Sequence, residues 1–238
     1  MTRNQYISCF VTIIAASVFV ASVAAAQKTS ELSADLPDSR TMAIQQKVER
    51  LYETGHFKRA YFIYRNELVP IGDKYAQYMV GFMSLTGLDV EQDPVAALAW
   101  YRLAAERGSP EIVEARDRLW QSMTDSDVKR AATLYFELRQ EYCDLAVILA
   151  SITRNHEELK NRTGSRTASY NSPVVVIDPQ RGAMSGDIYY GDIREQLKSR
   201  LMLLREIGGF QDMSVDPDRF NLRDLQHRVE QRIAAEAN

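Results

Sequence analysis

The stretch AQYMVGFMSLTGLDVEQDPVAALAWYRLAAERG, residues 76–108, decides the fold of this chain. In each half, apolar residues recur three and four positions apart, which places them on one face of a helix. These residues are Ala76, Met79, Val80 and Met83 in the first half, and Ala97, Trp100, Tyr101, Ala104 and Ala105 in the second half. Two such short helices cannot bury both faces by themselves, so the stretch predicts neighbouring helix pairs of the same kind.

An internal repeat extends this pattern to both sides of the stretch. Alanine and tyrosine four positions apart occur at intervals in the mid-thirties, which is the period of helix-pair repeats. These pairs are Ala60 and Tyr64, Ala97 and Tyr101, and Ala131 and Tyr135. The small alanine lets the two helices of a pair approach closely. We therefore expect a repeat domain over residues 41–140, with clear repeats at residues 41–72 and 73–108 and a degenerate one at residues 109–140.

Residues 87–108 carry the pattern G-x-x-V-x-x-D-x-x-x-A-x-x-W-Y-x-x-A-A-x-x-G. The pattern resembles the Sel-one-like repeat (SLR), a relative of the tetratricopeptide repeat. Two positions depart from that family: Asp89 stands where a second glycine is usual, and Ser84 stands where an aromatic residue is more usual. The resemblance implies an all-α fold, a short right-handed solenoid of helix pairs. It also implies a role as adaptor, scaffold or regulator, which SLR proteins typically have.

The composition is that of an ordinary soluble globular protein, with 45% hydrophobic and 26% charged residues. A formal net charge of −3 gives no bulk attraction to nucleic acid or to an anionic membrane. His56, His156 and His227 are far apart and lack metal-ligand spacing. The sequence has no phosphate-binding loop, nucleotide fingerprint or nucleophile elbow. We therefore expect no nucleic-acid partner, no metal, no cofactor and no enzymatic activity.

The N-terminal segment differs from the rest of the chain. A polar start is followed by an apolar run, residues 7–20, and by small residues that end in Ala24-Ala25-Ala26. This order predicts a secretory signal peptide, residues 1–26, and hence a periplasmic or secreted bacterial protein with no stable membrane span after cleavage. The alternative is an N-terminal membrane anchor, because residues 7–26 are long enough to span a bilayer. A flexible leader is expected at residues 27–40.

Residues 141–238 are predicted to form a C-terminal helical module. Apolar spacing predicts helices at residues 141–161, 192–207 and 221–235. A loop or small β-hairpin is expected at residues 162–192, with one strand in the β-like run 172–179 and the returning strand at residues 187–190. Cys143 is the one cysteine left after cleavage of the signal peptide, and we interpret it as a buried small hydrophobe.

Three aromatic residues of the opening stretch and its flank lie off the core stripe of the first helix. These are Tyr75, Tyr78 and Phe82. Helix-pair arrays present rows of side chains to a partner on their concave side. We therefore expect these aromatic side chains to be left over by the packing and to contact a protein partner.

Two further candidate sites lie in residues 162–192. Arg162 and Arg166 flank a turn of small residues, where arginine and backbone N–H groups would hold an anionic group of a partner. The alternative is a helix C-cap on Gly164 with two solvated arginines. Tyr189 and Tyr190 would point to opposite faces of a strand, so that one of them would be an exposed binding anchor. The alternative for this pair is packing at a sheet edge.

The function predicted from these features is that of an exported, periplasmic, non-enzymatic adaptor or regulator that binds a protein of the cell envelope. The alternative is an accessory or inhibitor protein of a peptidoglycan or exopolysaccharide machine, which would contact glycan through exposed tyrosines. A third hypothesis is an enzyme with its site in residues 162–192, although that segment lacks a nucleophile–base pair.

Overall fold

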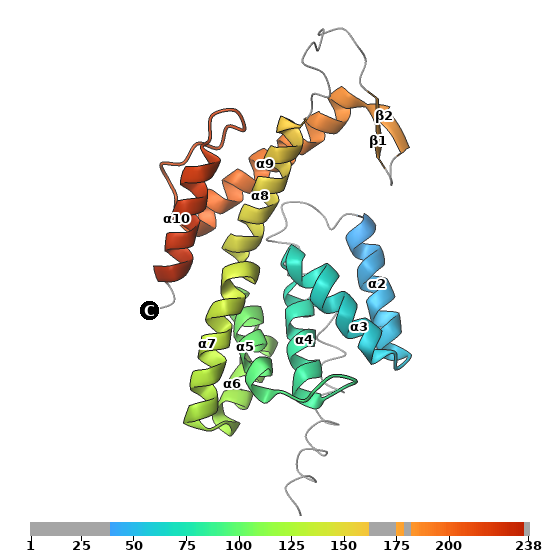
Figure 1. Cartoon of the computed structure of the whole chain (residues 1–238), viewed down its shortest axis with the longest axis vertical. Helices are drawn as coiled ribbons and strands as arrows, with labels where there is room; N and C mark the ends of the chain where they lie inside the picture. The colour runs from blue at the N-terminus through green and yellow to red at the C-terminus, as the bar shows by residue number, and fades with distance from the viewer. Residues whose placement is uncertain (1–38, 162–174, 179–181, 236–238) are drawn as a thin grey trace, which may run out of the picture. The chain divides into compact units, whose positions relative to one another are not determined.

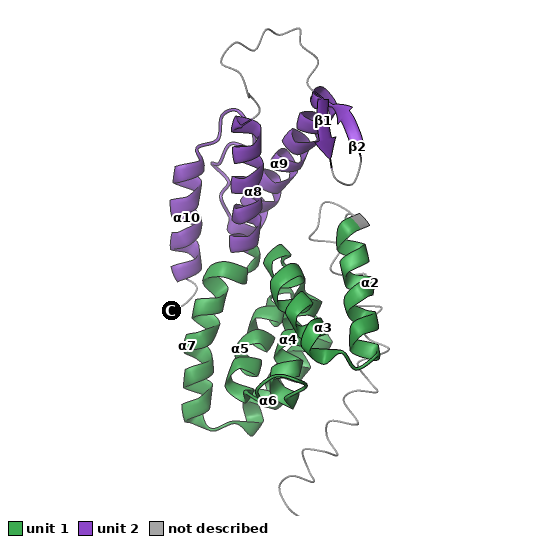
Figure 2. Cartoon of the chain, turned by 45° about the vertical axis from the view of Figure 1, so that its right-hand side comes forward, with its two compact units in different colours: residues 1–144 green, residues 145–238 purple. Residues whose placement is uncertain are grey.

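A computed structural model describes residues 39–161, 175–178 and 182–235 of the chain (Figure 1). The chain forms two compact units, residues 1–144 and residues 145–238, which are coloured separately in Figure 2. The predicted signal peptide and the predicted Arg162 and Arg166 site lie outside the described residues. Within the described residues, no helix is both long and apolar enough to cross a membrane.

Unit 1 is built from helix pairs, as the sequence predicts. The first pair is α2 (Ser39–Glu53) and α3 (Phe57–Ile63), which continues as a π-helical turn η2 (Tyr64–Leu68) and a 3₁₀ turn η3 (Val69–Ile71). The second pair is α4 (Lys74–Thr86) and α5 (Pro94–Ala104), followed by the 3₁₀ turn η4 (Ala105–Arg107). The third pair is α6 (Pro110–Ser122) and α7 (Asp125–Tyr142). The helical-repeat fold is therefore confirmed.

The core of unit 1 is centred on α5, which packs against α4, α6 and α7 (Figure 2). The predicted stripe of α5 is buried, including Trp100 and Tyr101. Gly81 on α4 lets the two helices of the second pair meet, because a Cβ at this position would lie 2.8 Å from a ring carbon of Tyr101. Apolar spacing in the opening stretch thus translates directly into helix-on-helix packing.

The loop between α4 and α5 contains Asp89, which stands where the repeat family usually has a second glycine. Asp89 has a φ of +54°, in the left-handed region that glycine adopts most readily. The position therefore favours the glycine that the family usually has. Asp93 ends the loop and caps α5, since its Oδ1 accepts hydrogen bonds of 2.9 Å from the backbone N–H groups of Val95 and Ala96. Asp93 thus has a structural role, as the N-cap of α5.

Unit 2 contains α8 (Asp144–Lys160, whose first residue still belongs to unit 1), α9 (Gly186–Gly208) and α10 (Leu222–Ala235), which lie side by side in Figures 1 and 2. Each helix buries one apolar stripe. The stripes are Leu145, Ile148 and Ile152; Ile193, Leu197, Leu201 and Leu204; and Leu225, Val229 and Ile233. Two strands, β1 (Val175–Asp178) and β2 (Gly182–Ser185), pair antiparallel with Val175 opposite Ser185.

The returning strand of this hairpin does not lie where the sequence analysis placed it. Residues 187–190 form the start of α9, and the strand β2 precedes them. The left-handed Gly182, with a φ of +77°, brings the chain back sooner than expected. The prediction relied on the β-propensity of Ile188, Tyr189 and Tyr190, which the longer amphipathic pattern of α9 overrides.

Candidate partner-binding site

The three aromatic residues predicted on α4 do not form an exposed row. Tyr78 is 6% exposed and Phe82 is 8% exposed, so the expectation that both face a partner is wrong. The ring of Tyr78 stacks on that of Tyr101 with centroids 5.0 Å apart, and it also stacks on Phe82. A helix in the middle of an array has neighbours on several sides, so residues off one apolar stripe are covered by the next helix. Tyr75 alone of the three is half-buried.

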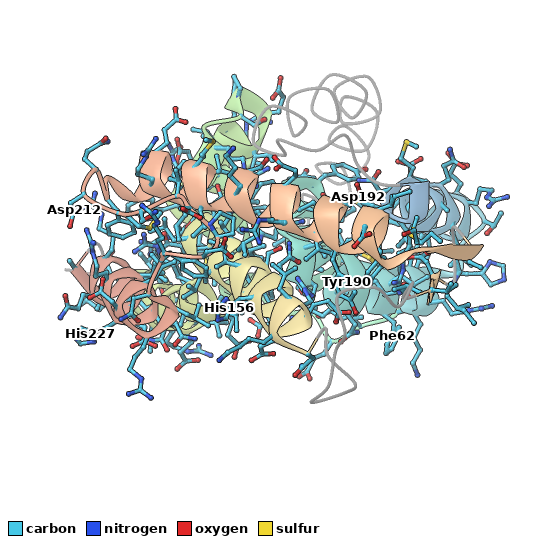
Figure 3. The ribbon with its side chains drawn as sticks, turned by 90° about the horizontal axis from the view of Figure 1, so that it is seen from above. Phe62, His156, Tyr190, Asp192, Asp212 and His227 are labelled. Carbon is cyan, nitrogen blue, oxygen red and sulfur yellow. The ribbon has the colours of Figure 1, made fainter. Side chains whose placement is uncertain are left out.

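The tyrosine pair of unit 2 lies on a helix and not on a strand. Tyr189 and Tyr190 occupy the first turn of α9, both half-buried, with ring centroids 5.2 Å apart in an edge-to-face arrangement. The Tyr189 hydroxyl donates a hydrogen bond of 3.5 Å to Glu158 on α8. Burial and the nearby carboxylate of Glu158 raise the pKa of Tyr189. Figure 3 labels Tyr190 and Asp192, which lie two residues apart on α9.

A different group of side chains comes together where α2, η2 and α4 meet. Spacing on α2 places Gln45, Glu49 and Tyr52 on the same helix face. The amide of Gln45 donates a hydrogen bond of 2.9 Å to Asp73, the residue that caps α4. We name the group the tyrosine–carboxylate cluster and define it by five residues. These are Glu49, Tyr52, Tyr64, Asp73 and Tyr75.

The rings of Tyr64 and Tyr75 contact each other, whereas the ring of Tyr52 packs edge to face on Phe57 with centroids 5.3 Å apart. Tyr64 meets Tyr75 edge to face with centroids 6.3 Å apart, and Tyr75 stacks on Tyr78 at 6.5 Å. Tyr52 and Tyr75 are half-buried, and Glu49 is exposed. The cluster therefore combines accessible aromatic surface with a carboxylate.

The carboxylates of the cluster act on the other ionisable groups in it. The pKa of Glu49 is raised, first by burial and then by the carboxylates of Glu53 and Asp73. Burial and the nearby carboxylates of Glu49 and Asp73 raise the pKa of Tyr75 as well. Tyr64 as a whole is 1% exposed; its hydroxyl forms no hydrogen bond with any described residue and is not one of the fully buried polar atoms of the described residues that lack a partner.

A second group of charged side chains in unit 1 is paired internally. Lys74 is 2% exposed, and its ammonium lies 2.8 Å from Glu106 and 3.2 Å from Asp144. Arg107 donates two hydrogen bonds, of 3.1 and 2.9 Å, to the carboxylate of Asp144. Arg139 on α7 lies 3.5 Å from Glu106. These pairs connect the second helix pair to Arg139 of α7 and to Asp144, the first residue of α8. We therefore assign them a structural role.

Metal chemistry finds no support in the parts of the chain that the structure describes. No group of three or more histidine, cysteine or carboxylate side chains is placed to hold a metal ion there. His156 packs edge to face on Phe220 at 5.1 Å, and burial, followed by the charge of Lys160, lowers its pKa. His227 lies on α10 beside Gln231, with 2.8 Å between their nitrogen atoms (Figure 3).

The successive helix pairs of unit 1 define a helical-repeat protein. Residues 74–109 match the family model of the Sel1 repeat, which covers α4, α5 and η4. The chain therefore contains a Sel1-like repeat. Repeats of this family generally mediate protein–protein interaction and are typically non-catalytic. No solved structure matches this chain.

The sequence analysis did not find the tyrosine–carboxylate cluster. It named Tyr64 only as a residue of the repeat and assigned no binding role to Glu49, Tyr52 or Asp73. The available signal was the presence of Gln45, Glu49 and Tyr52 on one face of α2. That signal becomes informative only when α2 is known to lie beside the start of α4.

Proposed function

We propose that this protein is an exported, non-enzymatic adaptor or regulator that binds a protein of the cell envelope through unit 1. The observation that carries the proposal is the Sel1-like repeat at residues 74–109, packed between further helix pairs. In this repeat, most aromatic residues and alanines fill the interior, including Tyr78, Trp100 and Tyr101, so these serve stacking, whereas Tyr75 is half-buried. Recognition is then left to the outer surface of the array.

The outer surface of unit 1 carries large side chains suited to a partner. Phe62 on α3 is 61% exposed and Trp120 on α6 is 51% exposed (Phe62 is labelled in Figure 3). Exposed aromatic residues are common anchors in protein interfaces, because they bury a large area with little loss of conformational entropy. Both residues belong to helix pairs that flank the matched repeat.

The proposal of export rests on the sequence of residues 1–26, with its apolar run and small residues before Gln27. N-terminal sequencing of the protein isolated from the envelope fraction of a producing bacterium tests it. We expect a mature chain that begins at Gln27. A chain that retains residues 1–26 and sediments with membranes would favour the anchor.

A glycan-related role is the second candidate, and the half-buried pair Tyr189 and Tyr190 favours it. Sugar rings stack on exposed tyrosine faces, and hydroxyl groups add hydrogen bonds. The protein would then accompany or inhibit a peptidoglycan or exopolysaccharide machine. Co-sedimentation of the purified protein with cell-wall sacculi separates this role from that of a pure protein adaptor, which predicts no retention.

Amine-specific crosslinking in intact cells, followed by mass spectrometry, tests the adaptor role. Unit 1 offers the exposed lysines Lys47, Lys58 and Lys129, and unit 2 offers Lys160 and Lys198 as an internal comparison. We expect crosslinks from one or a few envelope proteins to lysines of unit 1. Crosslinks confined to unit 2, or a broad set of unrelated proteins, would contradict the proposal.

A further inference from the structure

We infer that the tyrosine–carboxylate cluster binds the cationic side chain of a lysine or arginine in the partner protein. The inference rests on the proposed function, because it names the chemistry of the partner that unit 1 recognises. Three observations carry it: the carboxylates lack a cation among the described residues, the hydroxyl of Tyr64 has no hydrogen-bond partner among them, and the aromatic rings beside them are partly accessible.

The first observation is an imbalance of charge. Within the described residues, no lysine or arginine forms an ion pair with Glu49, Glu53 or Asp73. Lys74 follows Asp73 directly, but its ammonium is held by Glu106 and Asp144 on another side of α4. The carboxylates of Glu53 and Asp73 raise the pKa of Glu49, and a cation placed beside Glu49 would stabilise its charged form. A partner's ammonium or guanidinium group would supply that charge.

The second observation is the hydroxyl of Tyr64. The residue as a whole is 1% exposed, no described residue forms a hydrogen bond with its oxygen, and this oxygen is not one of the fully buried polar atoms of the described residues that lack a partner. The ring meets Tyr75 edge to face, and the groups of Glu49, Asp73 and Tyr52 lie within electrostatic range of the hydroxyl. A lysine carries three N–H donors and an arginine carries five, so either would donate to this oxygen.

The third observation is the aromatic surface. Tyr52 and Tyr75 are half-buried on neighbouring helices, which leaves part of each side chain accessible. Cations bind the faces of such rings, most strongly where the site is partly desolvated. The chain uses this chemistry elsewhere, since the guanidinium of Arg65 lies 4.9 Å from the ring centroids of both Trp100 and Tyr142. In the cluster the rings and the carboxylates are present, and the cation is to be supplied by the partner.

Fluorescence anisotropy with the purified protein tests the inference. The probe is a short fluorescein-labelled peptide of repeating Gly-Ser-Lys, and its lysine-acetylated form is the matched uncharged probe. We expect saturable binding of the first peptide and at least a tenfold weaker affinity for the second. Equal affinity for both peptides, or no saturation up to concentrations on the order of 1 mM, would overturn the inference.

Variants with equal changes of net charge separate the cluster from general electrostatic attraction. Glu49→Gln removes one exposed carboxylate of the cluster, and Glu137→Gln removes one exposed carboxylate of α7. We expect Glu49→Gln to weaken peptide binding about fivefold and Glu137→Gln to leave it unchanged, since a cation–π and carboxylate site acts locally. Equal weakening by both variants would overturn the inference. Glu49→Lys supplies an internal cation and is expected to abolish binding in a protein whose circular dichroism is unaltered.

Failure of the inference is distinguishable from failure of the proposed function. If the basic peptide does not bind but envelope proteins still crosslink to unit 1, the adaptor role stands and the cluster is not its recognition site. If neither is observed, both fall. Retention of the protein by sacculi without a crosslinked protein points to the glycan-related role.

Discussion

Gly81 on α4 lies against Tyr101 on α5 so closely that a Cβ on the glycine would be 2.8 Å from the Cδ1 atom of the tyrosine. The ring cannot retreat easily, because its other face stacks on Tyr78. Gly81→Ala gains roughly 0.5–1 kcal/mol of helix propensity but adds an overpacking cost of about 1–3 kcal/mol. We expect a net loss in the free energy of unfolding of roughly 1 kcal/mol, measured by urea denaturation.

The control for this prediction is another glycine inside a helix. Gly191 on α9 has no atom within 4 Å of an added Cβ. Gly191→Ala is therefore expected to stabilise the protein by roughly 0.5–1 kcal/mol. The two substitutions thus have opposite expected signs. Stabilisation by Gly81→Ala would show that α4 and α5 are not in such close contact.

Lys74 offers a test of the buried ion pairs. Lys74→Met keeps much of the side-chain volume but leaves Glu106 and Asp144 without their shared ammonium. Removal of one partner from a buried pair costs about 3–5 kcal/mol, and we expect about 3 kcal/mol here because the two arginines remain. Arg118→Met breaks an exposed pair with Glu114 and is expected to cost under ~0.5 kcal/mol. Similar losses in the two variants would contradict a structural role for Lys74.

The same group of charges makes stability depend on pH. Burial alone would raise the pKa of Asp144, but the ammonium of Lys74 and the guanidinium of Arg107 outweigh burial and lower it. Because the folded pKa lies below the unfolded value of about 4, the carboxylate stabilises the fold fully above that pH. This contribution is lost as the pH falls through the folded pKa.

Urea denaturation of the wild type and of Asp144→Asn at a series of pH values checks this dependence. Asp144→Asn is expected to be less stable at neutral pH and to lose less stability on acidification below about pH 4. Parallel pH profiles for the two proteins would show that Asp144 does not provide the linkage.

Asp89 allows a test of the left-handed loop residue. With a φ of +54°, Asp89 adopts a conformation that costs an ordinary L-residue about 1–2 kcal/mol and that glycine adopts freely. Asp89→Ala is expected to lower the thermal midpoint, because alanine lacks the local hydrogen bonding that lets aspartate adopt this conformation. Asp89→Gly is expected to leave it unchanged or raise it. A higher midpoint for Asp89→Ala than for Asp89→Gly would be inconsistent with the left-handed conformation.

The repeat array could be predicted from the sequence because its helices and caps depend on residues that lie close together along the chain. The stripe with Trp100 and Tyr101 and the cap at Asp93 are set within one helix or one turn, so a single sequence reveals them. The exposure of Tyr78 and Phe82 depends instead on which helices flank α4. Tertiary packing determines whether these two side chains are buried, and this packing cannot be read from the spacing of residues within α4.

The candidate site was beyond prediction for the same reason. The hydrogen bond between Gln45 and Asp73 joins residues on different helix pairs, and Tyr64, whose ring meets that of Tyr75, lies in the π-helical turn η2. Each residue has an ordinary local role, as a helix-face, cap or repeat residue. Their common environment becomes visible only after α2 and α4 have been placed in space.

Site-specific photocrosslinking in living cells tests the central claim most directly. Tyr52 is replaced by the photoreactive analogue p-benzoylphenylalanine, which keeps an aromatic ring in the tyrosine–carboxylate cluster, and the same replacement at Tyr189 is the control in unit 2. The account predicts a light-dependent crosslink from position 52 to a lysine- or arginine-rich segment of one envelope protein, weakened by Glu49→Lys in the same chain. No crosslink at position 52, or the same products from positions 52 and 189, would contradict it.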